Sequence, residues 1–147
     1  MVHTFAAIYI GSYEVSMKIF EISARKKIRT IDYIRSRIEL GKDVLSRGSI
    51  GYELVEVLCN TLAEYKEIME GYRVDSCEAY AAAVFRDAEN EIFLIDQIRI
   101  RTGLVVKVLS NSEHRFISYK SVAMQEGFEH MIPTGAAVLE VDGSGLQ

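Results

Sequence analysis

The stretch AAIYIGSYEVSMKIFEI, residues 6–22, decides the fold. Its apolar run reaches Gly11 and Ser12, and beyond this break apolar residues alternate with polar ones from Val15 to Ile19. Because successive side chains of a strand point to opposite faces, the pattern predicts a buried strand, a tight turn and a half-buried return strand. A Gly-Ser turn is able to offer backbone N–H groups to an anion. The stretch therefore predicts a β-hairpin, and leaves open whether the hairpin is a phosphate site.

Composition narrows the class of protein. The chain has 147 residues, 49% of them hydrophobic, which is enough to bury one core without disulfides or a metal. Its 17 basic and 21 acidic residues give a net charge of −4, which disfavours a broad nucleic-acid surface. Cys59 and Cys77 are isolated from each other and from any histidine at ligand spacing, so we expect reduced thiols rather than a zinc site. No apolar run approaches the roughly 18 residues of a membrane span. We expect a cytoplasmic protein without a membrane or nucleic-acid partner.

The elements after the hairpin follow from periodicity and turn residues. Residues 25–40 predict a third strand, whose basic start we interpret as a solvated hairpin tip rather than a polyanion contact. Residues 41–51, rich in glycine and serine, predict a loop. Residues 52–72 place apolar side chains on one stripe at helical spacing, which predicts a long amphipathic helix ended by Gly71.

The second half alternates strand and helix. Residues 74–85 are small and apolar enough for a strand covered on both faces. A helix follows, with Asp87 or Asn90 as its N-cap and Gly103 just past its end.

A short β-branched strand is expected over residues 104–109. Ser110 and Glu113 then have the S-x-x-E spacing of a capping box, which predicts the start of a third helix. Residues 136–147 predict a last apolar strand that runs into a Gly-rich turn.

This order of elements predicts an α/β fold. Three hairpin-linked strands followed by strand and helix in alternation are typical of a mixed five-stranded sheet flanked by helices, as in ribonuclease-H-like domains. Residues 1–147 are expected to form one such domain. Because an apolar strand and turn should lead into further structure, we expect an N-terminal domain followed by a second domain of the same protein.

Four stretches, in the right order and spacing, resemble the exopolyphosphatase and guanosine-pentaphosphate phosphohydrolase (Ppx/GppA phosphatase) family. The hairpin resembles its first phosphate loop, A-A-I-D-x-G-S-N-S. Residues 37–53 are similar to its R-x-x-L-G-E-G-L motif, and residues 81–122 to its R-D-A-x-N and T-G motifs and to the stretch with two adjacent glutamates. Residues 138–147 stand where its second phosphate loop would lie.

The resemblance implies the two-domain architecture of the actin, sugar-kinase and Hsp70-like ATPase superfamily, of which this chain would be the first domain. In the family, polyphosphate or a guanosine nucleotide (pppGpp) binds in the cleft between the domains with Mg²⁺. Water then attacks the terminal phosphoanhydride.

Matched position by position, the resemblance implies three sets of site residues. The phosphate-binding set is Gly11, Ser12, Arg86, Gly143 and Ser144. The only candidates for a catalytic base are Glu113 and His114, and the candidate metal ligands are Glu140 and Asp142.

Several chemical positions depart from the family pattern. Tyr9 replaces the Asp of the first loop, and His114 replaces the second of two adjacent glutamates, the presumed base. Asp142 brings a negative charge into a loop where the family has glycine, although like charges repel. A phenol is a poor Mg²⁺ ligand at neutral pH, and an imidazole does not replace the charge of a carboxylate.

Each candidate also has a structural interpretation. Tyr9 suits a core or cleft-wall aromatic, and Glu113 suits the capping box. His114 fits an exposed first-turn histidine. Arg86 is equally suited to pair with a nearby carboxylate such as Asp87 or Glu89.

Three hypotheses remain open. The first is an N-terminal domain of a phosphoanhydride hydrolase with a degraded catalytic set, and the second is a non-catalytic domain that senses polyphosphate or a nucleotide or serves as a scaffold. The third is an active enzyme in which Glu140 or Asp142 has taken over metal binding. Under all three the isolated domain is expected to be inactive.

Overall fold

The computed structural model describes residues 1–25, 27–124, 141–142 and 145–146. Its main sheet has five strands in the order β3-β2-β1-β4-β5. The hairpin strands β1 (His3–Ile10), β2 (Glu14–Ile22) and β3 (Ile28–Arg37) pair in antiparallel fashion. β4 (Ser76–Ala81) and β5 (Val106–Val108) continue the sheet parallel to β1. The predicted mixed five-stranded α/β fold is confirmed.

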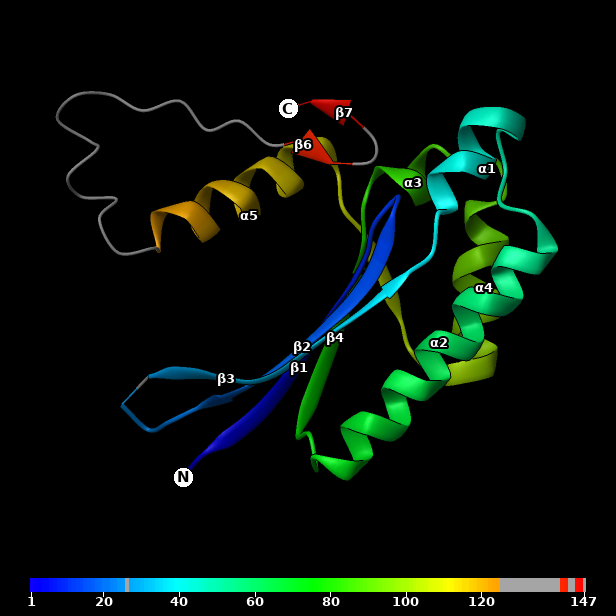
Figure 1. The fold of residues 1–147 in the computed structure, drawn as a ribbon. Helices are drawn as coiled ribbons and strands as arrows, with labels where there is room; N and C mark the ends of the chain where they lie inside the picture. The colour runs from blue at the N-terminus through cyan, green and yellow to red at the C-terminus, as the bar shows by residue number, and fades with distance from the viewer. Residues whose placement is uncertain (26, 125–140, 143–144, 147) are drawn as a thin grey trace, which may run out of the picture.

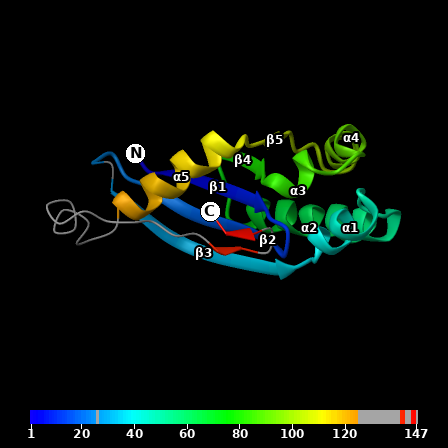
Figure 2. The same ribbon diagram turned by 90° about the horizontal axis from the view of Figure 1, so that it is seen from above.

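Helices cover the two faces of this sheet. Figure 1 shows α2 (Tyr52–Gly71) and α4 (Glu91–Thr102) packed together on one face and α5 (Asn111–Ala123) on the other. Figure 2 views the same arrangement from above, with α5 beside β1. None of the helices among the described residues has the length and apolar character needed to cross a membrane.

The hydrophobic core lies between the sheet and the α2–α4 layer. Alternate residues of β1 and β2 are almost completely buried, as the opening stretch predicts; they are Ala6, Ile8, Ile10, Val15, Met17 and Ile19. The helices contribute residues spaced three and four apart, among them Leu58, Leu62, Tyr65, Leu94 and Ile98. The strand period and the helix period therefore meet in one core.

Two expected segments are different in the structure. The loop expected over residues 41–51 is largely a helix, α1 (Leu40–Arg47), and the third strand ends before it. The Asp43 carboxylate accepts hydrogen bonds from the Arg47 guanidinium (2.6 Å) and the Gly51 N–H (2.7 Å), which stabilises a helix too short for its period to be recognised.

The strand expected over residues 74–85 is also shorter. β4 ends at Ala81, and a single turn of helix, α3 (Ala83–Arg86), follows it. Val84 and Phe85 point from α3 into the core, so burial alone did not distinguish this turn from a strand.

The predicted helix ends are mostly confirmed. Asn90 occupies the N-cap position of α4, and Gly103 ends it with a left-handed φ of 76°. At α5 the Ser110 hydroxyl accepts from the Glu113 N–H (3.2 Å), and the Glu113 carboxylate accepts from the Ser110 N–H (2.8 Å). Residues 136–140 of the expected last strand lie outside the described residues. The described part of this stretch forms two short antiparallel strands, β6 (Val141–Asp142) and β7 (Gly145–Leu146).

Candidate functional site

The candidate site lies where three neighbouring parallel strands end. The Ala82 N–H donates to the Ile10 carbonyl (3.0 Å) and the Leu109 N–H donates to the Ala81 carbonyl (2.9 Å), so the segments after β1, β4 and β5 leave the sheet at one edge. Open α/β sheets bind ligands beyond the carboxyl ends of their strands. Five of the predicted site residues lie in the segments that follow these strands: Gly11, Ser12, Arg86, Glu113 and His114.

The turn of the β1–β2 hairpin is tight. The Gly11 N–H donates to the Glu14 carbonyl (3.0 Å), which closes the turn. A Cβ at Gly11 would lie 3.1 Å from that carbonyl oxygen and 3.2 Å from the Tyr9 ring. Gly11 therefore allows a close approach of backbone and ring, and leaves Ser12 at the tip of the turn.

A second stretch packs directly against this turn. The Gly41 N–H, at the start of α1, donates to the Ser12 carbonyl (2.8 Å), and the Ile38 N–H donates to the Tyr13 carbonyl (3.1 Å). A Cβ at Gly41 would lie 3.0 Å from the Ser12 Cβ. Gly41 thus supports the turn, a role that sequence reasoning missed because the contact joins residues far apart in the chain.

We expect Gly41→Ala to displace the turn and to lower the free energy of unfolding by about 1–2 kcal/mol, since overpacking a tight contact is destabilising. Gly71→Ala is the matched control, because a Cβ at this helical position meets nothing within 4 Å. The control should be neutral or stabilising by about 0.5–1 kcal/mol. Urea denaturation of both variants measures the difference, and equal stability of the two would contradict the support role of Gly41.

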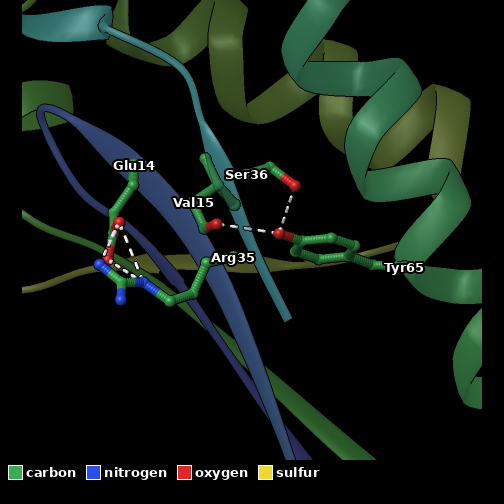
Figure 3. A network of polar contacts seen from close by, with 5 residues as sticks. All are labelled: Glu14, Val15, Arg35, Ser36 and Tyr65. Atoms are coloured by element: carbon green, nitrogen blue, oxygen red, sulfur yellow. Dashed lines mark hydrogen bonds and ion pairs between the residues drawn. The ribbon is translucent and has the colours of Figure 1, made fainter. Parts of the chain in front are cut away.

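The first residues of β2 are fixed from both faces of the sheet (Figure 3). On the core face, the Tyr65 hydroxyl of α2 donates to the Val15 carbonyl (2.9 Å) and contacts the Ser36 hydroxyl (2.8 Å). Burial raises the pKa of the Tyr65 phenol, which therefore stays a neutral donor. On the opposite face, Arg35 donates to the Glu14 carboxylate (2.8 Å).

Removal of the Tyr65 hydroxyl tests this support. Tyr65→Phe keeps the ring but leaves the Val15 carbonyl and the Ser36 hydroxyl without this partner, and we expect a loss of about 1–2 kcal/mol in the free energy of unfolding. Tyr33→Phe, at an exposed tyrosine of β3, should change stability by less than about 0.5 kcal/mol. Calorimetric melting that finds the two variants alike would show that the buried hydroxyl contributes nothing.

Arg86 connects α3 to the start of α5. Its Nη1 donates to the Leu109 carbonyl (2.9 Å), its Nη2 donates to the Asn111 side chain (2.8 Å), and its Nε lies 3.7 Å from the Asp87 carboxylate. The predicted pairing with Asp87 is thus formed. A guanidinium has five N–H donors, so these contacts leave capacity for a ligand.

Tyr9 and His114 contact each other directly. The Tyr9 hydroxyl lies 3.0 Å from His114 Nε2, and the two rings are stacked with centroids 6.1 Å apart. Since only 9% of His114 is exposed, the prediction of an exposed first-turn histidine is wrong. The Ser110 cap fixes where α5 begins, and this start turns position 114 toward the face of β1 that carries Tyr9.

The donor chemistry of the described residues does not fit a Mg²⁺ site. Mg²⁺ selects carboxylates and water, whereas a phenol and an imidazole meet here. The Glu113 carboxylate is engaged in the α5 cap, where hydrogen bonds from Ser110 hold its pKa below the usual range. Nowhere in the part of the chain that the structure describes do three His, Cys, Asp or Glu side chains gather in a way that suits a metal.

The structure does not describe the side chains of four predicted site residues. Glu140, Gly143 and Ser144 lie outside the described residues, and for Asp142 the structure gives the backbone position in β6 alone.

Other motif residues hold the scaffold together. The Asn90 side chain donates to the Ile50 carbonyl (2.9 Å) and accepts from the Ile50 N–H (3.1 Å), so it bridges to the segment before α2 rather than capping its own helix. The Thr102 hydroxyl accepts from the Leu104 N–H (3.2 Å) beside Gly103, which completes the end of α4. Both residues lie in stretches that resemble the family, and both support the scaffold around the site.

Comparisons with known proteins agree with this structure. The sequence model described as the Ppx/GppA phosphatase family matches residues 18–142. The crystal structure of the Aquifex aeolicus member of the Ppx/GppA family is 28% identical, with a TM-score of 0.79 over 84% of this chain and 40% of that chain. The type II variant of the Aquifex aeolicus Ppx/GppA phosphatase is 30% identical, with a TM-score of 0.75 over 82% of this chain and 40% of that one.

A more distant structure shares the fold. An exopolyphosphatase from Cytophaga hutchinsonii has a TM-score of 0.79 at 21% identity, over 84% of this chain and 39% of that chain. The chain thus spans about 40% of the length of these solved structures. No curated protein sequence matches it significantly.

Proposed function

The chain belongs to the Ppx/GppA phosphatase family, and from this membership we propose that it is a phosphate-binding N-terminal domain whose hydrolytic residues have been replaced. Its ligand would be polyphosphate or a guanosine nucleotide. Binding without turnover is the function of a sensing domain, whereas a scaffold domain would show no stabilisation by these anions.

One observation carries the proposal, the hydrogen bond between Tyr9 and His114. These are the positions of the Asp and the presumed base in the family motifs that the chain resembles. Hydrolysis of a phosphoanhydride needs an oriented water and neutralised charge, which carboxylates and metal ions provide. The bond to the Tyr9 hydroxyl occupies Nε2 of His114, and Glu113 serves as a helix cap, so neither side chain is arranged to activate water.

The contrast between two groups of motif residues supports the same proposal. Gly41, Asn90 and Gly103 match the family motifs and hold the scaffold around the site. Tyr9 and His114 depart from those motifs and carry the chemical change. A chain that keeps the residues that support the site, but replaces those that would activate water, is suited to binding phosphate rather than hydrolysing it.

Ligand contacts are proposed for the predicted phosphate-binding residues. Ser12 lies at the tip of the hairpin turn, and Arg86 supplies a guanidinium suited to phosphate. Gly143 and Ser144 would contribute from the second loop. Because the chain spans about 40% of its solved relatives, we propose that a second domain of the same protein completes the cleft. The two free cysteines are consistent with a reducing cytoplasm.

Thermal melting tests the proposed binding. A ligand at 100 times its Kd should add about 2.7 kcal/mol, or about 5–10 °C in Tm for a domain of this size. We expect tripolyphosphate, long-chain polyphosphate or pppGpp to raise the Tm, with no phosphate released. Ser12→Ala should reduce the shift, and Ser46→Ala on exposed α1 should leave it unchanged. The absence of a shift with all three ligands would contradict the proposal.

A further inference from the structure

We infer that this domain binds its phosphate ligand without a divalent metal ion, because the Tyr9–His114 pair stands where metal-assisted chemistry would need carboxylates. The inference rests on the proposed function and specifies the form of the ligand, a polyphosphate anion free of Mg²⁺.

The polar atoms of Tyr9 and His114 are already engaged with each other. The Tyr9 hydroxyl and His114 Nε2 lie 3.0 Å apart and form a hydrogen bond, in which one of the two atoms donates and the other accepts through a lone pair. His114 is 9% exposed and its ring stacks with the Tyr9 ring, so the contact is part of the packing of α5 on β1. A Mg²⁺ ion demands near-octahedral oxygen ligands, and binding at this pair would break that packing.

The side chains at positions 9 and 114 also change the charge at this edge of the sheet. A carboxylate at position 9 or 114 would repel a phosphate anion, and a bound cation would have to offset it. Positions 9 and 114 carry a phenol and an imidazole. Among the described residues, the Asp87 carboxylate lies 3.7 Å from Arg86, and the Glu113 carboxylate caps α5. The Arg86 guanidinium then faces the anion without a metal ion as intermediary.

Excess Mg²⁺ should weaken the binding of polyphosphate to such a site. In solution Mg²⁺ binds polyphosphates through their oxygens and lowers the concentration of the free anion. A site made for the free anion therefore binds more weakly when Mg²⁺ is in excess, which is the opposite of a site that needs the metal complex.

Isothermal titration of tripolyphosphate into the protein, once in EDTA and once in excess Mg²⁺, tests this inference. We expect binding in EDTA and an apparent affinity at least several-fold weaker in Mg²⁺. Binding that requires Mg²⁺ would overturn the inference but leave phosphate binding intact, and would point to Glu140 or Asp142 as metal ligands. The absence of binding in both buffers would overturn the proposed function together with the inference.

The converse experiment introduces carboxylates at positions 9 and 114. The double variant Tyr9→Asp with His114→Glu should lose at least about tenfold in affinity in EDTA and should regain part of it on addition of Mg²⁺. Tyr33→Asp, which adds a charge on the exposed face of β3, is the matched control and should retain the wild-type response. Tyr9→Asp alone serves if the double variant does not fold, and a wild-type response from the folded variant would overturn the inference.

Discussion

Phe85→Ala should lower the free energy of unfolding by about 3–5 kcal/mol, the largest loss that we expect from a single substitution in this chain. Phe85 is completely buried and lies in α3, the single helical turn between β4 and α4. A turn so short has no helical stability of its own, so its position depends on the aromatic ring that anchors it. Loss of the ring leaves a cavity under the segment that carries Arg86.

The same substitution should also affect the site. Arg86 follows Phe85 directly and joins α3 to Leu109 and Asn111, so a displaced α3 loosens the start of α5. Differential scanning calorimetry should show a fall of about 6–20 °C in Tm. Phe116→Ala, at an exposed phenylalanine of α5, is the control and should change stability by less than about 0.5 kcal/mol. A small effect of Phe85→Ala would show that α3 is held by other contacts.

Asn90→Ala should cost about 2–3 kcal/mol, because one side chain satisfies both the N–H and the carbonyl of Ile50. Ile50 is 3% exposed, so these backbone groups have little access to water once the amide is removed. Each buried polar group left without a partner costs about 1–3 kcal/mol. The bridge also fixes the segment between α1 and α2, so hydrogen exchange should increase there.

The control for this prediction is Asn60→Ala. Asn60 is exposed on α2, and its amide oxygen lies 3.4 Å from Arg101 Nη2, a weak contact. Guanidinium denaturation of the two variants should therefore give a loss for Asn90→Ala and little change for Asn60→Ala. Equal stabilities would mean that water replaces the Asn90 amide without cost.

The sheet could be predicted because its signals are local. Residues 6–22 alternate with the period of a strand on either side of a Gly-Ser turn, and the structure has β1 and β2 at this place. The capping box at Ser110 and Glu113 and the glycine at position 103 lie within a few residues of the ends that they define. By contrast, α1 and α3 are short and depend on tertiary contacts, which a window of sequence does not contain.

The site could be predicted only in part. The resemblance named the residues that leave the sheet at its edge, but not the contact between Tyr9 and His114, which are 105 positions apart. In the sequence the two partners are separate departures from family motifs, and the pattern favours an exposed position for His114. The structure brings the two departures together as one hydrogen-bonded pair, which is a relation between elements and not a property of either stretch.

Phosphorus NMR of tripolyphosphate mixed with the protein tests the central claim most directly, because one sample reports both binding and hydrolysis. The account predicts broadened or shifted resonances of the bound anion in EDTA, a smaller effect of the protein in excess Mg²⁺, and no growth of an orthophosphate resonance in either buffer. Growth of orthophosphate at a rate proportional to protein concentration would contradict the loss of hydrolysis. Unchanged tripolyphosphate resonances at protein concentrations equal to the ligand would contradict the retained phosphate site.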